Sequence, residues 1–187
     1  MKLKPKFLLN SIKIILILAT INVAYLAWRY LALRQGWVQP GTAICSISDF
    51  VDCDKVLLTA EARAFYVPNA LLGFGFFFGS LIWIFLGFKL NEAYHHHIIR
   101  TFFFWLVIAA FFTFRFFYLL VQLPAFCPLC PVSHFLTYIL LVSSYLLWKR
   151  TPQIQEKKSF KPLILLVVLC VGQFWLWLCL WFVLSGL

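Results

Sequence analysis

The first apolar block of the chain, residues 7–33, decides the fold class and reads FLLNSIKIILILATINVAYLAWRYLAL. It is longer than the roughly 20 residues that a helix needs to cross a bilayer. Lysines precede it, as in a secretory signal, but the apolar core of a signal is only about 7 to 15 residues long and ends at a small-residue cleavage site. This block instead runs into Trp28, Arg29 and Tyr30, a pattern typical of an interfacial aromatic belt. We therefore expect a retained transmembrane helix.

The composition of the whole chain agrees with a membrane protein. Hydrophobic residues make up 64% of the 187 residues, aromatic residues 20% and charged residues only 12%, whereas a typical soluble domain is roughly 25% charged. These values exclude a water-soluble globular protein and a disordered chain. A transmembrane barrel would show short alternating segments instead of long apolar blocks. We expect one all-α polytopic membrane domain over residues 1–187.

Further apolar blocks of similar length follow the first. The expected membrane spans cover residues 7–33, 70–88, 101–123, 127–148 and 162–187. The first four are expected to form a four-helix transmembrane bundle and the last a fifth transmembrane helix. Five spans place the two termini on opposite sides of the membrane.

The longest polar stretch, residues 34–69, separates the first two spans and forms the outer loop. Within it, residues 54–65 have apolar residues at helical spacing and acidic residues at the start, which predicts a short helix on the membrane surface. Pro68 is expected to end that helix. Asn69 is then well placed to cap the second span, whose glycines at 73, 75 and 79 permit close helix packing.

Lys and Arg are distributed unevenly among the connections. The richer side of this topology holds Lys2, Lys4, Lys6, Lys13, Lys89, Arg100, Lys149, Arg150, Lys157, Lys158 and Lys161, and the other side holds mainly Arg34, Lys55 and Arg63. Because cytoplasmic loops collect Lys and Arg, we expect the N-terminus in the cytoplasm and the outer loop in an oxidising compartment, the periplasm if the membrane is a bacterial inner membrane. The same bias accounts for the net charge of +10, so nucleic-acid binding is not expected.

Two cysteine pairs fall on the outer side and carry the strongest chemical signal. Cys45 and Cys53 lie in the outer loop, and Cys127 and Cys130 open the fourth span as CPLCPVSH, residues 127–134. A helix N-terminus lowers the pKa of the first thiol of such a Cys-x-x-Cys pair, and the thiolate is the attacking species in disulfide exchange. Static disulfides and a four-cysteine zinc site are the alternatives. The unequal pair spacing and the oxidising compartment disfavour zinc.

The order of these motifs resembles the vitamin K epoxide reductase family, especially its bacterial homologues. The resemblance rests on CSISDFVDC at 45–53, the following DKVLLTAEARAFYVPNALLGFG, and CPLCPVSH at 127–134. It covers residues 45–148 and, by topology, the first span. Family members often carry a fused thioredoxin domain after the fifth span. This chain ends at Leu187, so the expected partner is a separate protein.

The resemblance implies a helical bundle around a quinone, either ubiquinone or menaquinone. Electrons are expected to move from a periplasmic or secreted thioredoxin-like (DsbA-like) partner to the loop pair, then to the helix pair, then to the quinone. Cys45 would exchange with the partner, Cys53 would relay to Cys127, and Cys130 would face the quinone. The implied activity is that of a quinone-dependent thiol-disulfide oxidoreductase that supports disulfide bond formation.

Three further positions match the family's quinone contacts. Asn69 and His134 are expected to donate hydrogen bonds to a quinone carbonyl, and Thr59 matches a Ser or Thr position of the surface helix. The alternatives are a plain helix cap for Asn69 and a histidine satisfied by a backbone carbonyl for His134. Animal enzymes of the family carry a tyrosine at the position of His134, which disfavours vitamin K epoxide as the substrate.

Other chemically notable residues have simpler interpretations. We expect Arg115, inside the third span, to extend toward the outer interface instead of serving the quinone. His95, His96 and His97 are expected in a solvated loop, because consecutive histidines cannot all face one metal ion. In the fifth span, Cys170 and Cys179 and the tryptophans are interpreted as packing, lipid-facing or interfacial residues.

Two other functions remain open from the sequence. One is a reductase of vitamin K quinone or epoxide in an endoplasmic reticulum membrane. The other is a non-enzymatic membrane assembly protein whose outer loop is held by structural disulfides.

Overall fold

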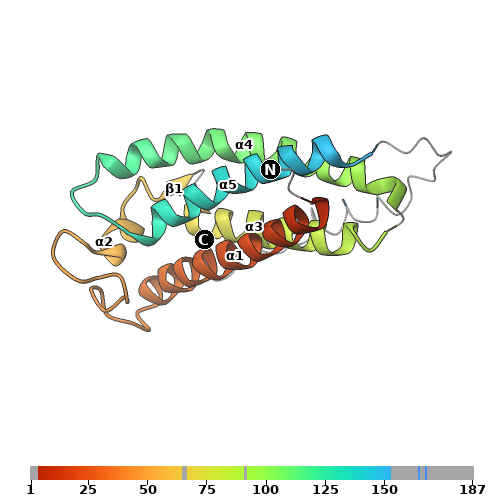
Figure 1. The fold of residues 1–187 in the computed structure, drawn as a ribbon. Helices are drawn as coiled ribbons and strands as arrows, with labels where there is room; N and C mark the ends of the chain where they lie inside the picture. Colours follow the sequence, from red (N-terminus) through yellow and green to blue (C-terminus); the bar gives the residue numbers. More distant parts are fainter. Residues whose placement is uncertain (1–3, 65–66, 91, 153–163, 165–166, 168–187) are drawn as a thin grey trace.

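Four long helices form the bundle in the computed structural model: α1 (Pro5–Arg34), α3 (Asn69–Gly87), α4 (His95–Val121) and α5 (Leu129–Arg150) (Figure 1). The structure describes residues 4–64, 67–90, 92–152, 164 and 167. Within these residues, 4 helices are long and apolar enough to cross a membrane. The expected all-α polytopic membrane protein is therefore confirmed. The fifth expected span, 162–187, with Cys170, Cys179 and its tryptophans, lies outside the described residues except at positions 164 and 167.

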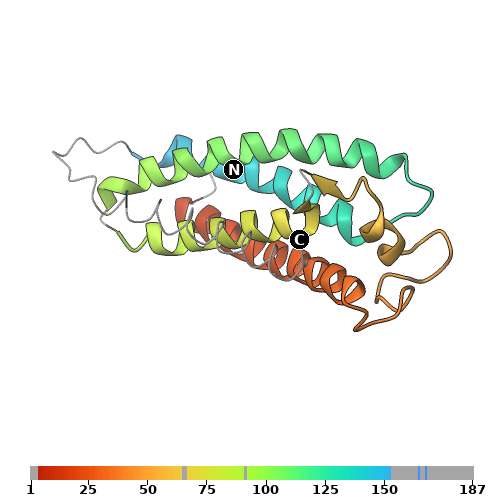
Figure 2. The same ribbon diagram turned by 180° about the vertical axis from the view of Figure 1, so that it is seen from behind.

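The four helices run along one common axis. Both ribbon views show α4 on one side of the bundle and α1 on the opposite side (Figures 1 and 2). Helix α1 packs against α3 and α5, and α4 packs against α5. In the half of the bundle farther from the outer loop, the core is closed by buried side chains such as Leu16, Trp83 and Phe102. Trp83 also donates its indole N–H to the carbonyl of Ile98 at 3.0 Å, which ties α3 to the start of α4.

The outward faces of the helices carry large apolar side chains. Phe111, Phe114 and Phe135 are 73%, 69% and 62% exposed. Such a continuous apolar exterior is unfavourable in water and suits contact with lipid. The burial pattern thus agrees with the composition, because the apolar residues exceed what the core of the bundle can bury.

Helix α4 begins earlier than expected. It starts at His95 after a short 3-10 helix η1 (Glu92–Tyr94), so the interpretation of His95, His96 and His97 as a solvated loop was wrong. The rings have structural partners: His95 Nε2 lies 3.2 Å from the Leu90 carbonyl oxygen, and Trp148 donates its indole N–H to His96 Nε2 at 3.1 Å. The second of these contacts joins the start of α4 to the end of α5.

The outer end of the bundle holds α2 (Cys53–Leu58) and a two-stranded antiparallel hairpin, β1 (Arg63–Ala64) and β2 (Val67–Pro68). The expected surface helix over 54–65 is therefore present but ends at Leu58, and Pro68 does not end it. Thr59 has an extended backbone and its hydroxyl accepts the Ala62 N–H at 3.3 Å, which turns the chain into the hairpin.

Asn69 is the first residue of α3, whose cap position is occupied by Pro68 without a side-chain cap bond. The expectation that Asn69 caps this helix was therefore wrong. Its amide N–H instead donates to the carbonyl of Glu61 at 3.1 Å, which leaves the rest of the side chain available for other contacts.

Close packing between α3 and α4 requires glycine at position 87. A Cβ built at Gly87 would lie 2.9 Å from Ile98 Cγ2, whereas one at Gly73 would lie 3.4 Å from Val23 Cγ1. We predict that Gly87→Ala lowers the thermal unfolding midpoint in detergent, at a cost of about 1–3 kcal/mol for overpacking. Gly73→Ala is the matched control and should be neutral or slightly stabilising, because alanine favours helix by up to about 1 kcal/mol. Equal midpoints for the two variants would contradict this packing.

Candidate functional site

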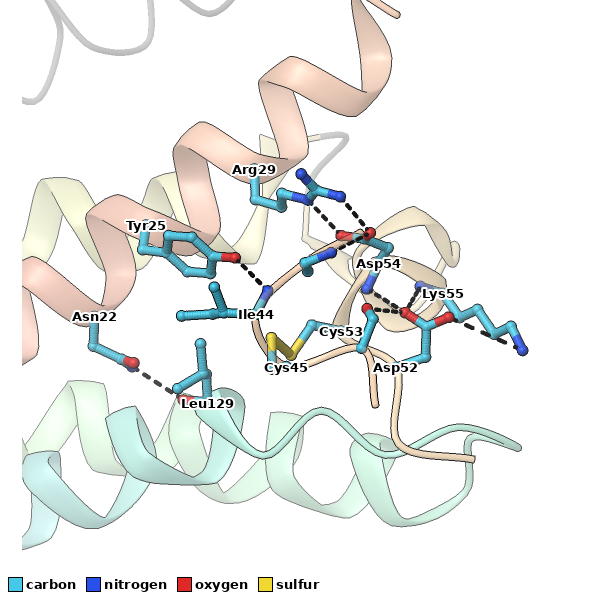
Figure 3. The surroundings of a disulfide bond; sticks show 12 residues. Asn22, Tyr25, Arg29, Ile44, Cys45, Asp52, Cys53, Asp54, Lys55 and Leu129 are labelled. Carbon is cyan, nitrogen blue, oxygen red and sulfur yellow. Dashed lines mark hydrogen bonds and ion pairs between the residues drawn. A yellow bond between two sulfur atoms is a disulfide. The ribbon is translucent and has the colours of Figure 1, made fainter. Parts of the chain in front are cut away.

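The loop pair is joined as a disulfide between Cys45 and Cys53, with Cα atoms 5.7 Å apart (Figure 3). Cys53 begins α2, and Cys45 lies in the loop that precedes it. Both are buried: Cys45 is 4% exposed and Cys53 is 0% exposed. The expected position of Cys45 in a loop is confirmed, but its side chain does not lie open to the solvent in this state.

A buried ion pair holds the loop against α1. Arg29 donates from Nε and Nη2 to the two carboxylate oxygens of Asp54 at 2.8 and 2.7 Å (Figure 3). The same carboxylate accepts the backbone N–H groups of Gly41 and Ala43 at 2.9 and 3.3 Å. Asp54 follows Cys53 directly, so the loop before Cys45 and the helix that begins at Cys53 are fastened to one carboxylate.

The electrostatics of Asp54 follow from these contacts. Burial alone would raise the pKa of the Asp54 carboxyl, but the hydrogen bonds and charge of Arg29 and the amides of Gly41 and Ala43 outweigh burial and lower it below its ordinary value. Asp54 is therefore an anion in the folded protein at neutral pH.

A short parallel bridge sets the helix pair beside the loop pair. Phe126 donates its N–H to the Phe50 carbonyl at 2.7 Å, and Asp52 donates its N–H to the Phe126 carbonyl at 3.1 Å. Asp52 precedes Cys53, and Phe126 precedes Cys127. Cys45, Cys53 and Cys127 accordingly lie in one buried apolar cluster, with Cys130 packed against it.

The two cysteines of the helix pair are free thiols in different surroundings. Cys127 is fully buried in the connection before α5, and Cys130 is half-buried in the first turn of that helix. The pKa of the Cys127 thiol is lowered, first because the Cys130 thiol donates a hydrogen bond to it and also because the amides of Cys130 and Leu129 point at it; burial acts in the opposite direction. The lowered pKa agrees in its direction with the expected activation of Cys127, the first thiol of the pair.

A cavity of about 440 Å³ lies between the outer halves of the helices. It is lined by α1, α2, the turn after α2, β1, α3, α4 and α5, and its walls are predominantly apolar. Cys130, Asn69 and His134 all line it, so the structure brings these three predicted residues together. Cys127 is not among the lining residues. The volume is within the roughly 300–1,000 Å³ of ordinary small-molecule sites.

Asn69, which lines this cavity, carries an unused acceptor. Its Oδ1 atom is buried and has no hydrogen-bond partner among the described residues. Because a buried polar atom without a partner costs free energy, the atom is suited to a ligand that donates a hydrogen bond. Among the polar lining residues, Thr113, Ser133 and Thr137 also come from α4 and α5.

The remaining predicted residues lie elsewhere. Thr59 forms the end of α2, where its hydroxyl bonds the Val56 carbonyl at 2.9 Å, and it does not line the cavity. Arg115 is exposed on α4 and is also absent from the cavity wall. Its expected extension toward the outer interface stays a prediction.

Residues 12–145 match the family model described as the vitamin K epoxide reductase family. The chain belongs to this family. No match was found among curated proteins or among solved structures. The matched range includes both cysteine pairs and the helices that enclose the cavity. Membership makes the chain a membrane oxidoreductase with a disulfide-bonded Cys45–Cys53 pair.

A four-cysteine zinc site was one alternative interpretation of the two cysteine pairs. Within the part of the chain that the structure describes, no group of three or more His, Cys, Asp or Glu side chains is placed to hold a metal ion. Cys45 and Cys53 are bonded to each other, a pairing that fits a redox-active disulfide and a structural one alike.

Sequence reasoning missed the polar residues of α1 that hold the site. Asn22 and Tyr25 received no role, and Arg29 was interpreted as part of an interfacial belt, although it is only 4% exposed. The available signal was their spacing, which places polar side chains at 22, 25 and 29 on one face of an otherwise apolar helix.

The Arg29–Asp54 pair predicts a specific pH dependence of stability. Because the folded-state pKa of Asp54 is lowered, its stabilisation is fully present above the ordinary carboxyl pKa of about 4 and is lost as the pH falls through the folded-state value. Asp54→Asn should cost about 3 kcal/mol at pH 7, since it leaves a buried guanidinium unpaired, and the gap to wild type should shrink as the pH falls below about 4.

The measurement is the thermal unfolding midpoint in detergent from pH 7 to pH 3. Asp49→Asn is the matched control, because Asp49 pairs with Lys55 at 3.1 Å with both side chains exposed, and it should change stability by less than about 1 kcal/mol. A gap for Asp54→Asn that stays constant down to the lowest pH would contradict the role of the charge.

Proposed function

We propose that the protein is a thiol-disulfide oxidoreductase that passes electrons from a reduced thioredoxin-like (DsbA-like) partner to a membrane quinone, ubiquinone or menaquinone, and so supports disulfide bond formation. The observation that carries this proposal is the division of the helix pair. Cys127 is buried in the same apolar cluster as Cys45 and Cys53, and Cys130, one turn along, lines the cavity. A dithiol placed in this way has one sulfur facing a disulfide and one facing a space for an oxidant.

In the first proposed step, a partner thiolate attacks Cys45. The bond between Cys45 and Cys53 breaks, a mixed disulfide forms between the partner and Cys45, and Cys53 leaves as a thiolate. The second thiol of the partner then attacks the partner sulfur that is bonded to Cys45. This releases Cys45 and leaves the partner with a disulfide of its own. The loop pair has then gained two electrons.

The second step moves these electrons to an oxidised helix pair. The Cys53 thiolate attacks Cys127, the bond between Cys127 and Cys130 breaks, and Cys130 leaves. Cys45 next attacks Cys53, which restores the loop disulfide and frees Cys127. The low pKa of Cys127 makes it a good leaving group here. The bonds recorded in the structure, with the loop pair oxidised and the helix pair reduced, correspond to the state after this step.

The cavity is where the electrons would leave the protein. A quinone bound there supplies a two-electron, two-proton acceptor at the membrane edge. The apolar walls suit a lipid-soluble ring, and Asn69 Oδ1 is an acceptor suited to a hydroxyl of the reduced form. His134 provides a ring nitrogen for the opposite role, as a donor. Cys130 is the sulfur on this side, so the helix pair is reoxidised from the cavity while Cys127 faces the loop.

The surface around Cys45 fits a protein partner. Its neighbours Ile44 and Ile47 are 77% and 78% exposed, and Phe50 in the same loop is 62% exposed. Exposed apolar side chains next to a disulfide provide contact area for a docking protein. Because Cys45 itself is 4% exposed, docking must displace part of this loop before the partner thiolate reaches the sulfur.

The proposed location is a bacterial inner membrane with the cysteine pairs in the periplasm. The helix directions place Lys4, Lys6, Lys89, Arg100, Lys149 and Arg150 near one end of the bundle. Helix α2 and the hairpin lie at the other end (Figures 1 and 2), and the disulfide includes Cys53, the first residue of α2. Since cytoplasmic ends are enriched in Lys and Arg, the first end would be cytoplasmic, and the redox end would face an oxidising compartment.

The relay predicts different phenotypes for the two cysteine pairs. In purified detergent-solubilised protein, Cys130→Ala should abolish quinone reduction with any reductant, because no dithiol then remains beside the cavity. Cys45→Ala should fail with a reduced thioredoxin-like protein yet retain reduction driven by a small dithiol that reaches the helix pair directly. Quinone absorbance reports both rates.

Circular dichroism and unfolding midpoints control for loss of fold in these variants. If wild-type protein reduces no quinone and both substitutions merely lower stability, the cysteines are structural and the assembly-protein alternative holds. If the epoxide of vitamin K is reduced faster than ubiquinone or menaquinone, the alternative substrate class holds.

The polar residues of the cavity lead to a prediction about the affinity for the reduced and the oxidised quinone. Asn69→Leu keeps the number and branching of the side-chain heavy atoms but removes the acceptor, so it should weaken binding of a short-chain hydroquinone about tenfold, the effect of one hydrogen bond of about 1.4 kcal/mol. His134→Phe should instead weaken the oxidised quinone more. Thr59→Val is the matched control, since Thr59 lies outside the cavity wall, and it should leave both affinities unchanged. Tryptophan fluorescence titrations measure these constants. Unchanged affinities in both cavity variants would exclude this site.

A further inference from the structure

We infer that one face of α1, formed by Asn22, Tyr25 and Arg29 and here called the α1 polar stripe, is the element that positions the redox cysteines for the relay. Each of the three residues holds the chain directly next to a different cysteine. The inference rests on the proposed function and adds positioning residues to it. All three side chains project from α1 toward the outer loop and the start of α5 (Figure 3).

Asn22 holds the helix pair. Its amide nitrogen donates to the Leu129 carbonyl at 3.0 Å and to the Ser133 hydroxyl at 2.7 Å. Leu129 immediately precedes Cys130, and Ser133 lines the cavity with it. Asn22 therefore fixes the first turn of α5, and with it the sulfur that faces the cavity, against α1.

Tyr25 holds the partner-facing side of the loop pair. Its hydroxyl oxygen accepts the Ile44 N–H at 3.1 Å, and Ile44 precedes Cys45. The bond is a single neutral contact at an exposed residue. Because such hydrogen bonds are worth only about 0.5–1.5 kcal/mol, this attachment is the weakest of the three.

Arg29 holds the relay side of the loop pair. Its bidentate, buried bond to Asp54 fixes the residue that follows Cys53. Breaking a buried charged pair costs about 3–5 kcal/mol, so the start of α2 is held more firmly than the chain at Ile44. Because the same carboxylate also binds Gly41 and Ala43, the ion pair holds the chain on both sides of the loop disulfide, and movement of Cys45 is confined to the chain from Ile44 onward.

Helix geometry explains why one stripe reaches all these points. Asn22, Tyr25 and Arg29 occupy positions i, i+3 and i+7 of α1. Residues with this spacing lie on one face of a helix, within an arc of about 60° and a rise of about 10.5 Å. Polar side chains in an apolar bundle are costly unless they are hydrogen-bonded. Their partners here are chain segments that carry cysteines, so α1 serves as a common rigid reference for both pairs.

The test compares Tyr25→Phe and Asn22→Leu with Thr20→Val. Thr20 is a control on the same helix, since its hydroxyl bonds the Leu16 carbonyl of α1 itself at 2.7 Å. Quinone reduction is measured with two reductants, a reduced thioredoxin-like protein and a small dithiol. We expect Tyr25→Phe to lower the protein-driven rate about tenfold, the kinetic effect of about 1.4 kcal/mol, because Cys45 must return to Cys53 to complete the relay. The dithiol rate should be unchanged. Asn22→Leu should lower both rates, and Thr20→Val neither.

A second readout does not depend on the quinone. The fraction of Cys45–Cys53 disulfide is measured by thiol alkylation and mass spectrometry in glutathione buffers of known ratio. Since the Tyr25 bond stabilises the loop in its oxidised arrangement, Tyr25→Phe should shift the equilibrium toward the dithiol about threefold or more. Arg29→Lys, which keeps the charge but not the bidentate geometry, should shift it in the same direction. Asn22→Leu should leave this equilibrium near that of the wild type.

The outcomes separate this inference from the proposed function. If wild-type protein reduces no quinone but Tyr25→Phe and Arg29→Lys shift the loop equilibrium, the quinone proposal fails while the positioning of the loop pair stands. If these two variants leave the loop equilibrium unchanged, or if Tyr25→Phe lowers both rates equally, the α1 polar stripe does not position the cysteines and the inference is wrong.

Discussion

The buried contact between Arg29 and Asp54 is the interaction on which the redox end of the molecule depends. It joins the outer end of α1 to the first turn of α2, and the same carboxylate binds the amides of Gly41 and Ala43. The outer loop between α1 and α2 has a large entropic cost of ordering because of its length. Fastening it at a charged, fully buried point lets the two loop cysteines occupy one defined position relative to the membrane helices.

The second constraint is the position of the helix pair at the start of α5. Cys127 precedes the helix, where the parallel bridge at Phe126 sets it beside the loop, and Cys130 lies within the first turn, where it faces the cavity. The two thiols are close enough for a hydrogen bond that lowers the pKa of Cys127. At the start of α5, Cys127 therefore lies in the buried contact with the outer loop, and Cys130 lines the cavity.

The sequence predicted the helices well and the details of the outer end less well. Long apolar blocks determine spans through hydrophobicity alone, so the ends of the four long helices fall within about two residues of the expected ones except at His95. Three features depend on contacts between distant residues: the early start of α4, the end of α2 at Leu58, and the orientation of Asn69. Local patterns carry no information about Trp148 binding His96 or about Glu61 binding Asn69.

The charge of Asp54 also bears on the chemistry next to it. An isolated carboxylate beside a cysteine pair disfavours a thiolate, and Asp54 does act to raise the pKa of Cys127. Its effect is weaker than that of the hydrogen bonds from Cys130 and Leu129, which lower this pKa. The guanidinium of Arg29 lies against the same carboxylate oxygens and brings a positive charge beside them. The loop thus gains a strong anchor at little cost to the thiolate, provided that the anchor is an ion pair. A carboxylate without its arginine would hold the loop less firmly and would also oppose the ionisation of Cys127.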